Sequence, residues 1–145
     1  MKIYLDMCSI QRPLDSKAQV RVAVEAEAIL NVIQLWEAGQ IELISSFALV
    51  FEAEQIPGNE RRTYTLEVLS RADSFVSRDE QIDAQAQGFV SFGIKPLDAL
   101  HLASAIALQA DYFCTCDDRF LRRAKQIDTA QTKVVSPLEL IAEIS

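Results

Sequence analysis

Short apolar runs alternate with longer amphipathic segments along this chain, and this alternation restricts its possible folds more than any other feature. The apolar runs predict strands at residues 3–5, 41–44, 75–77, 112–116 and 134–135. Strands that alternate with helices favour a parallel sheet with helices on both faces. We therefore predict an α/β fold with three layers and a sheet of about five parallel strands.

Periodic apolar positions and capping residues place the helices between these strands. Residues 18–38 carry apolar side chains at spacings of three and four, and Gly39 stands where a helix would end. Ser46 and Asn59 are the expected N-caps of two helices, and Pro96 suits the first position of another. Further helices are expected over residues 46–57, 59–72, 79–92, 96–109 and 119–125, and from residue 137 onward.

The length and composition fit a globular protein that does not bind nucleic acid by bulk charge. The 145 residues suit one domain over residues 1–145, and the net charge is −7. Any nucleic-acid-binding role therefore requires a local basic patch or bound cations. Three cysteines without a regular framework argue against a disulfide-rich secreted protein. No stretch suits a membrane span, and Asp6 interrupts the apolar N-terminus, so we expect a cytoplasmic protein.

Four acidic residues fall near the expected strand ends, where parallel sheets carry their functional sites. Asp6 follows the first strand, Glu52 lies in the helix after the second, and Asp117 follows the fourth. Asp98 lies in the first turn of the helix that Pro96 opens. At one rim these carboxylates repel one another unless a cation is bound. Mg²⁺ and Mn²⁺ prefer such oxygen ligands and activate water for phosphodiester hydrolysis.

Each acid also has a purely structural interpretation. Asp98 is placed to complement a helix dipole, and Asp117 or Asp118 to cap the next helix. Glu52 is explained equally well as a solvated helix residue. Asp6 is the hardest to explain in this way, because an acid that ends an apolar strand must be accommodated near the core. Spacing alone therefore leaves both interpretations open.

Four sequence blocks resemble the PIN-domain family, and the resemblance covers nearly the whole chain. The blocks are Ile3-Tyr-Leu-Asp6, Ser46-Phe-Ala-Leu-Val-Phe-Glu52, Pro96-Leu-Asp-Ala-Leu-His-Leu-Ala-Ser-Ala105 and Thr115-Cys-Asp-Asp-Arg-Phe120. The last two blocks, at this separation, are the specific signal. The resemblance implies a five-stranded parallel sheet and a ribonuclease that uses Mg²⁺ or Mn²⁺. It also implies an RNA substrate, a homodimer and a toxin role with a small antitoxin protein as partner.

The resemblance also assigns roles to individual residues. Its catalytic and metal-binding positions correspond to Asp6, Glu52, Asp98 and Asp117. Thr115 matches a hydroxyl that often supports the site, and Ser9 is expected to form a hydrogen bond nearby. The chain departs from the family pattern shortly after the first Asp, where members commonly carry Ser, Thr or Asn. Met7 and Cys8 stand there instead, which leaves open the details around the four acids.

Several other residues allow two interpretations. His101, the only histidine, is expected to support the fold or the acidic site rather than to act in catalysis. Cys114 and Cys116 are expected to be buried thiols on one face of a strand, with Thr115 on the other. Two basic groups either hold RNA phosphates or form ordinary solvated faces; they are Arg119, Arg122, Arg123 and Lys125, and Arg12, Lys17 and Arg21.

Competing functions fit the sequence less well. A haloacid-dehalogenase-like phosphatase would need a second Asp where Cys8 stands, and a receiver domain would need paired acids and a lysine at the end of the last strand. An RNA-processing nuclease without an antitoxin and a non-catalytic PIN-like interaction module remain alternatives. Of the adjacent acids, we predict Asp117 as the metal ligand, in line with Thr115, and Asp118 as the cap of the next helix.

Overall fold

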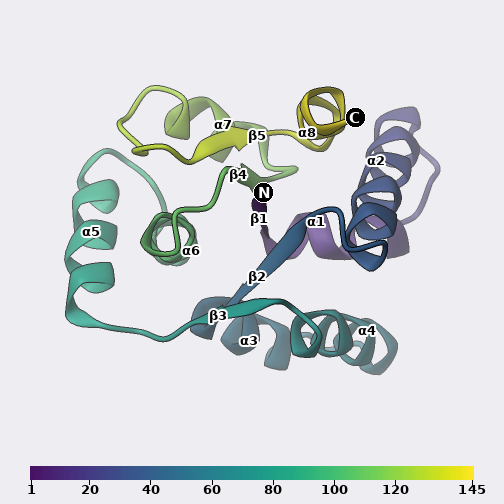
Figure 1. Ribbon diagram of the computed structural model, residues 1–145, viewed down its shortest axis with the longest axis horizontal. Coiled ribbons are helices and arrows are strands. Elements are labelled where there is room, and N and C mark those ends of the chain that lie inside the picture. The colour runs from purple at the N-terminus through teal and green to yellow at the C-terminus, as the bar shows by residue number, and fades with distance from the viewer.

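The computed structural model describes residues 1–145 and contains one five-stranded parallel sheet (Figure 1). Its strands are β1 (Lys2–Leu5), β2 (Glu42–Ser46), β3 (Ser74–Val76), β4 (Tyr112–Cys114) and β5 (Lys133–Val135), in the order β3-β2-β1-β4-β5. Apolar β1 takes the central position, where Ile3, Tyr4 and Leu5 are at most 2 % exposed. The predicted three-layer α/β fold is confirmed.

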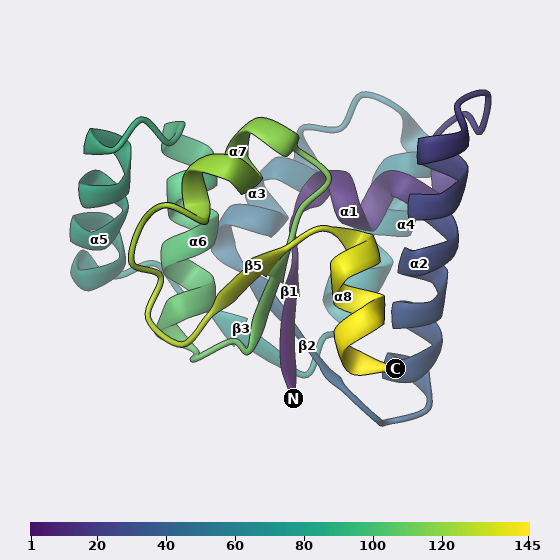
Figure 2. The same ribbon diagram turned by 90° about the horizontal axis from the view of Figure 1, so that it is seen from above.

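Helices cover both faces of this sheet. They are α1 (Met7–Gln11), the 3-10 helix η1 (Arg12–Leu14), α2 (Val20–Glu37), α3 (Phe47–Glu54), α4 (Asn59–Ser70), α5 (Glu80–Ser91), α6 (Pro96–Ala107), α7 (Asp118–Ala124) and α8 (Pro137–Ile144). Helices α5 and α6 lie on one side of the sheet, and α2 and α8 lie on the other (Figure 1). Figure 2 shows α1 and α7 at the edge where the strands end.

The structure differs from the sequence prediction in three local details. Helices α1 and η1 were not expected; α1 forms because the Asp6 carboxylate accepts a hydrogen bond from the Ser9 backbone N–H and caps it. Gly58, not Asn59, is the N-cap of α4. Strand β4 ends at Cys114 rather than Cys116, because its neighbour β5 also ends there and leads directly into α8.

An aromatic stack ties the sheet to α7. The Tyr4 and Phe113 rings of the neighbouring strands β1 and β4 stack with centroids 5.1 Å apart. Phe120 of α7 meets Phe113 edge to face at 5.4 Å. This packing fixes the position of α7, and with it the acidic residues at its start, over the end of the sheet. None of the helices is both long and apolar enough to cross a lipid bilayer.

Candidate active site

All four predicted acids line one cavity at the end of the sheet where the strands finish. The cavity has a volume of about 340 Å³. Its lining residues are Asp6, Met7, Cys8, Arg12, Glu52, Asp98, His101, Cys116 and Asp117. Asp6 directly follows β1, Glu52 lies in α3, Asp98 lies in α6 and Asp117 lies in the segment after β4, so four separate parts of the chain contribute one carboxylate each. The parallel topology therefore brings together side chains that lie up to 111 positions apart in the sequence.

Asp6 is the most enclosed of the four, with only 7 % of its surface exposed. Its Oδ1 accepts hydrogen bonds from the Ser9 backbone N–H and the Cys8 thiol, both at 3.1 Å. Burial raises the pKa of Asp6, while hydrogen bonds from Thr115, Cys8 and Ser9 act in the opposite direction. Helix α1 thus provides the donors that hold this carboxylate at the cavity wall.

Asp98 carries the clearest electrostatic sign that the acids share one field. Burial is the largest cause that raises its pKa from 3.8 to about 6, followed by the charge of Asp6. Asp117 and Glu52 raise it further, whereas His101 lowers it. The negative charges of three neighbouring carboxylates favour the protonated form of half-buried Asp98. The same negative charges would attract a cation to the site.

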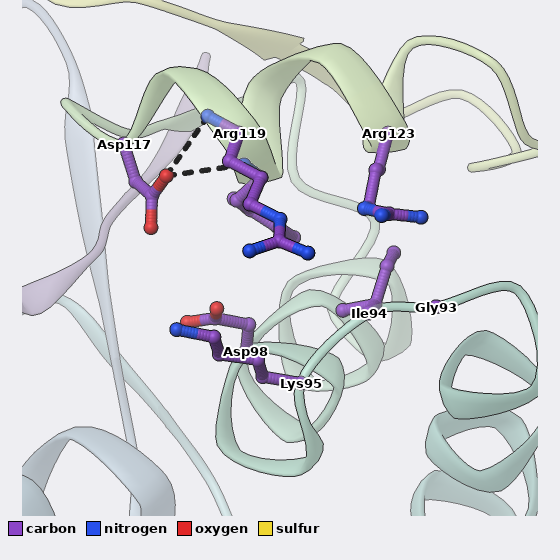
Figure 3. A pocket seen from close by; sticks show the side chains of 8 residues that line it. Gly93, Ile94, Lys95, Asp98, Asp117, Arg119 and Arg123 are labelled. Atoms are coloured by element: carbon purple, nitrogen blue, oxygen red, sulfur yellow. Dashed lines mark hydrogen bonds between the residues drawn. The ribbon is translucent and has the colours of Figure 1, made fainter.

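Asp117 and Asp118 divide their roles differently from the prediction. Asp117, not Asp118, is the N-cap of α7, because its Oδ1 accepts from the backbone N–H groups of Arg119 and Phe120 at 2.9 and 3.1 Å. Figure 3 shows the second carboxylate oxygen of Asp117 turned toward Asp98. Asp118 is the first residue of α7 and binds Arg21 through two contacts of 2.6 and 2.7 Å. One carboxylate therefore both caps the helix and lines the cavity.

Glu52 is held by a chain of buried hydrogen bonds that begins in the sheet. His101 Nε2 lies 2.7 Å from Glu52 Oε1, and Nδ1 lies 2.6 Å from the Tyr4 hydroxyl. Tyr4 in turn lies 2.6 Å from the hydroxyl of Ser46, which accepts from the Leu49 backbone N–H. Because a carboxylate only accepts, Nε2 donates to Glu52, and in the neutral ring Nδ1 accepts from Tyr4. Every member of the chain then has a partner.

The two supporting residues lie beside the cavity in different ways. The Thr115 hydroxyl accepts from the Asp117 backbone N–H at 3.1 Å and lies 3.8 Å from the Cys8 sulfur. The Ser9 hydroxyl donates instead to the Cys114 carbonyl at 3.1 Å. Ser9 therefore contacts Asp6 through its backbone N–H, and its side chain fastens α1 to β4. Cys114 and Cys116 are buried, as expected.

The two predicted basic groups have different surroundings. Arg12 lines the acidic cavity but contacts Asp15 at 3.0 Å and Glu25 at 3.2 Å. Arg21 contacts Glu25 as well as Asp118, so this group is largely neutralised. The α7 group retains free cations. The sequence interpretation missed Tyr4, Ser46 and Lys95 as neighbours of the site. Only Lys95 had a signal in the sequence, because it directly precedes Pro96 at the start of a helix whose first turn carries Asp98.

The donor set suits a hard divalent cation, although the acids do not form a closed cage. No three Asp, Glu, His or Cys side chains are grouped closely enough to hold a metal ion by themselves. The cavity nevertheless offers four carboxylates. Mg²⁺ is commonly held by one or two carboxylates with water in its remaining positions, so these residues fit such an ion.

Comparisons with solved structures agree with this fold. The fold resembles a chain of VapBC2 from Rickettsia felis bound to a DNA fragment from their promoter, with a TM-score of 0.63 and 14 % identity over 94 % of this chain and 98 % of that chain. For a chain of VapBC-1 from nontypeable Haemophilus influenzae, the TM-score is 0.60 and the identity is 18 %, over 95 % of this chain and 99 % of that chain. For a chain of DNA-bound VapBC from Salmonella typhimurium, the TM-score is 0.58 and the identity is 15 %, over 94 % of this chain and 98 % of that chain. A search of curated proteins gave no match.

A family model decides the assignment. The model described as "PIN domain" matches residues 3–126, which include all four acids of the cavity and the strands that precede them. This match extends over most of the chain and agrees with the resemblance carried by the four sequence blocks. The chain belongs to the PIN-domain family.

Proposed function

We propose that this protein is an endoribonuclease that hydrolyses RNA phosphodiester bonds with Mg²⁺ or Mn²⁺ as cofactor, and that residues 1–145 form one nuclease domain. The observation that carries the proposal is the cavity in which Asp6, Glu52, Asp98 and Asp117 converge. Carboxylates alone, without a set of histidine or cysteine ligands, suit a hard cation rather than zinc. These four residues would hold the ion.

The residues of the chain prepare the site for that chemistry. A bound divalent ion supplies a water of lowered pKa and stabilises charge on the phosphoryl oxygens. Asp6 and Asp117 are fixed by backbone N–H donors, and His101 fixes Glu52. Burial and the charges of the other acids raise the pKa of Asp98, and a bound cation would oppose both effects and favour loss of its proton. A site fixed in this way needs little rearrangement to act.

We further propose that the protein acts as a toxin that a small antitoxin protein inhibits, and that it forms a homodimer. The likeness in fold to chains of three VapBC complexes supports the toxin role, and the family resemblance supports both partners. The net negative charge of the protein and its acidic cavity would attract a basic segment of the antitoxin. An RNA-processing nuclease without an antitoxin, or a non-catalytic interaction module, is the alternative.

Cleavage of a labelled single-stranded RNA of mixed sequence tests the activity. We expect cleavage with Mg²⁺ or Mn²⁺, none in excess chelator, and none for Asp6→Asn. Glu52→Gln should also abolish it, whereas Glu54→Gln should not, because Glu54 lies exposed on the same helix and makes no side-chain contact with the cavity. Undiminished cleavage in chelator, or by Asp6→Asn, would overturn the mechanism. A protein that binds the metal but cleaves no RNA would favour the interaction module.

A further inference from the structure

Most Lys and Arg side chains of this protein contact neighbouring acceptors. Of the 14 Lys and Arg side chains, most contact a carboxylate, a backbone carbonyl or an amide oxygen. Four make no side-chain hydrogen bond or ion pair: Lys95, Arg119, Arg122 and Arg123. All four belong to α7 or to the residue before α6. The free positive charge of an acidic protein is therefore concentrated in one place.

Three of these four cations line a small pocket beside the acidic cavity. The pocket has a volume of about 50 Å³, which admits a small polar group but no nucleobase. Its lining residues are Gly93, Ile94, Lys95, Asp98, Asp117, Arg119, Phe120 and Arg123. Asp98 and Asp117 line both this pocket and the acidic cavity, so the two spaces are immediate neighbours. Figure 3 shows the Arg119 side chain reaching down from α7 toward Lys95 and Asp98.

Gly93 keeps one wall of the pocket open for Arg123. The backbone of Gly93 has a φ of +92°, which favours glycine, and it follows the end of α5. A Cβ atom at this position would lie 2.5 Å from Nη1 and 3.3 Å from Cζ of Arg123. The guanidinium therefore lies against the bare backbone of Gly93, and any side chain there would displace it. Arg123 is thus packed into the wall while its donors remain without acceptors.

Three cations without a hydrogen-bond or ion-pair partner outnumber the two carboxylates that line the same pocket, and such an excess of positive charge favours an anionic ligand. Guanidinium and ammonium groups are the common donors to phosphate oxygens in nucleic-acid complexes. Because the two spaces share the wall formed by Asp98 and Asp117, a strand whose cleaved phosphodiester lay over the acidic cavity could place a neighbouring phosphate at this pocket. We propose that Lys95, Arg119 and Arg123 form a subsite for the phosphate of single-stranded RNA next to the cleaved bond. The inference rests on the proposed ribonuclease function and adds how its substrate is held.

Arg122 provides a matched control for this subsite. It belongs to the same helix as Arg119 and Arg123 and has no partner either, but it does not line the pocket. A subsite predicts that Arg119→Gln or Arg123→Gln weakens RNA binding and that Arg122→Gln does not. A diffuse positive field predicts that all three variants behave alike. Since these side chains make no internal hydrogen bond or ion pair, the variants should keep a melting temperature close to that of the parent protein.

The test measures binding of a fluorescein-labelled single-stranded RNA by anisotropy at several salt concentrations with Mg²⁺. Asp6→Asn is the background, so that the RNA stays intact. We expect Arg119→Gln and Arg123→Gln each to raise Kd about tenfold and to reduce the slope of log K against log salt by about 0.7 per lost phosphate contact. Arg122→Gln should change Kd less than about twofold. Unchanged Kd in the first two variants, or equal loss in all three, would overturn the subsite.

Two further measurements separate this proposal from its neighbours. The first is competition between hexaglutamate and an RNA of equal charge. If hexaglutamate displaces the RNA from the parent protein but not from Arg123→Gln, the pocket binds an acidic protein segment and the RNA subsite is overturned. RNA binding that depends on Arg119 and Arg123 in a protein that never cleaves RNA would support the subsite and contradict the ribonuclease function. Arg123→Gln is also made in the protein that retains Asp6. If this variant cleaves RNA with an unchanged KM, the subsite is overturned and the ribonuclease function is not.

Discussion

Asp98→Asn should make the metal-free protein more stable at neutral pH, because the native fold holds this carboxylate beside three others. Burial and the charge of Asp6 raise the pKa of Asp98 from 3.8 to about 6. The native state thus binds the Asp98 proton more tightly than the unfolded chain does. As pH rises from about 4 through 6, ionisation of Asp98 lowers the free energy of unfolding, and the loss is complete above pH 6.

The size of this effect follows from the shift. At about 1.4 kcal/mol per pKa unit, a rise from 3.8 to about 6 corresponds to at most about 3 kcal/mol. Asp98 is only half-buried, so solvent screening reduces the expected gain to about 1–2 kcal/mol. Asparagine keeps the shape of the side chain and removes the charge. The free energy of unfolding of the variant should therefore exceed that of the parent by this amount at pH 7.5, and the difference should become smaller at pH 4.5.

Urea unfolding in chelator, followed by the fluorescence of the single tryptophan Trp36, measures the difference. Asp128→Asn is the control, because Asp128 is exposed and does not line the cavity. Comparing variants at each pH cancels the titration of all other groups. The addition of Mg²⁺ should stabilise the parent more than Asp98→Asn. A variant that is no more stable than the parent at pH 7.5, or equally stabilised at both pH values, would refute the electrostatic argument.

Substitutions at three further residues test the parts of the site separately. Asp117→Ala should remove the cap of α7 and lower the free energy of unfolding by about 1 kcal/mol, whereas Asp117→Asn should keep the cap. Both variants should lose RNA cleavage. Cleavage by Asp117→Asn would refute the role of Asp117 as a metal ligand. Asp118→Ala should leave cleavage intact and lower the melting temperature slightly, since it breaks only an exposed pair with Arg21. His101→Ala should cost about 2–4 kcal/mol in urea unfolding and weaken Mg²⁺ binding in calorimetry, because it opens a cavity and releases Glu52; unchanged Mg²⁺ affinity would refute that positioning role.

The sequence predicted the layers of this fold and the edge that carries the acids for clear physical reasons. Each strand is a short apolar run, and Asp6 and Asp117 follow two of these runs directly. Buried parallel strands must be apolar on both faces, so their ends are marked by the first polar residue. The helices between them have periodic patterns long enough to recognise. These signals are local, and they fix which elements form.

The details that the sequence did not reveal depend on contacts between distant residues. Helix α1 has only five residues, too few for a period, and its cap uses Asp6, which also reads as the end of a strand. Tyr4 looks like one more apolar strand residue, yet its hydroxyl meets His101, 97 positions away. The assignment of the cap to Asp117 rather than Asp118 depends on where α7 begins, a boundary that sequence patterns leave uncertain by a residue or more.

The distribution of committed and free cations gives the proposed site a direction. On the α2 side of the acidic cavity, Arg12 and Arg21 are neutralised by Glu25 and further carboxylates. On the α6 and α7 side, Arg119 and Arg123 have no such partners and face the neighbouring pocket. An anionic strand is attracted toward free donors and gains little from donors already paired. We therefore expect bound RNA to leave the acidic cavity over α7 and past Gly93 rather than across α2, and crosslinks from a reactive phosphate analogue should fall on the α7 side.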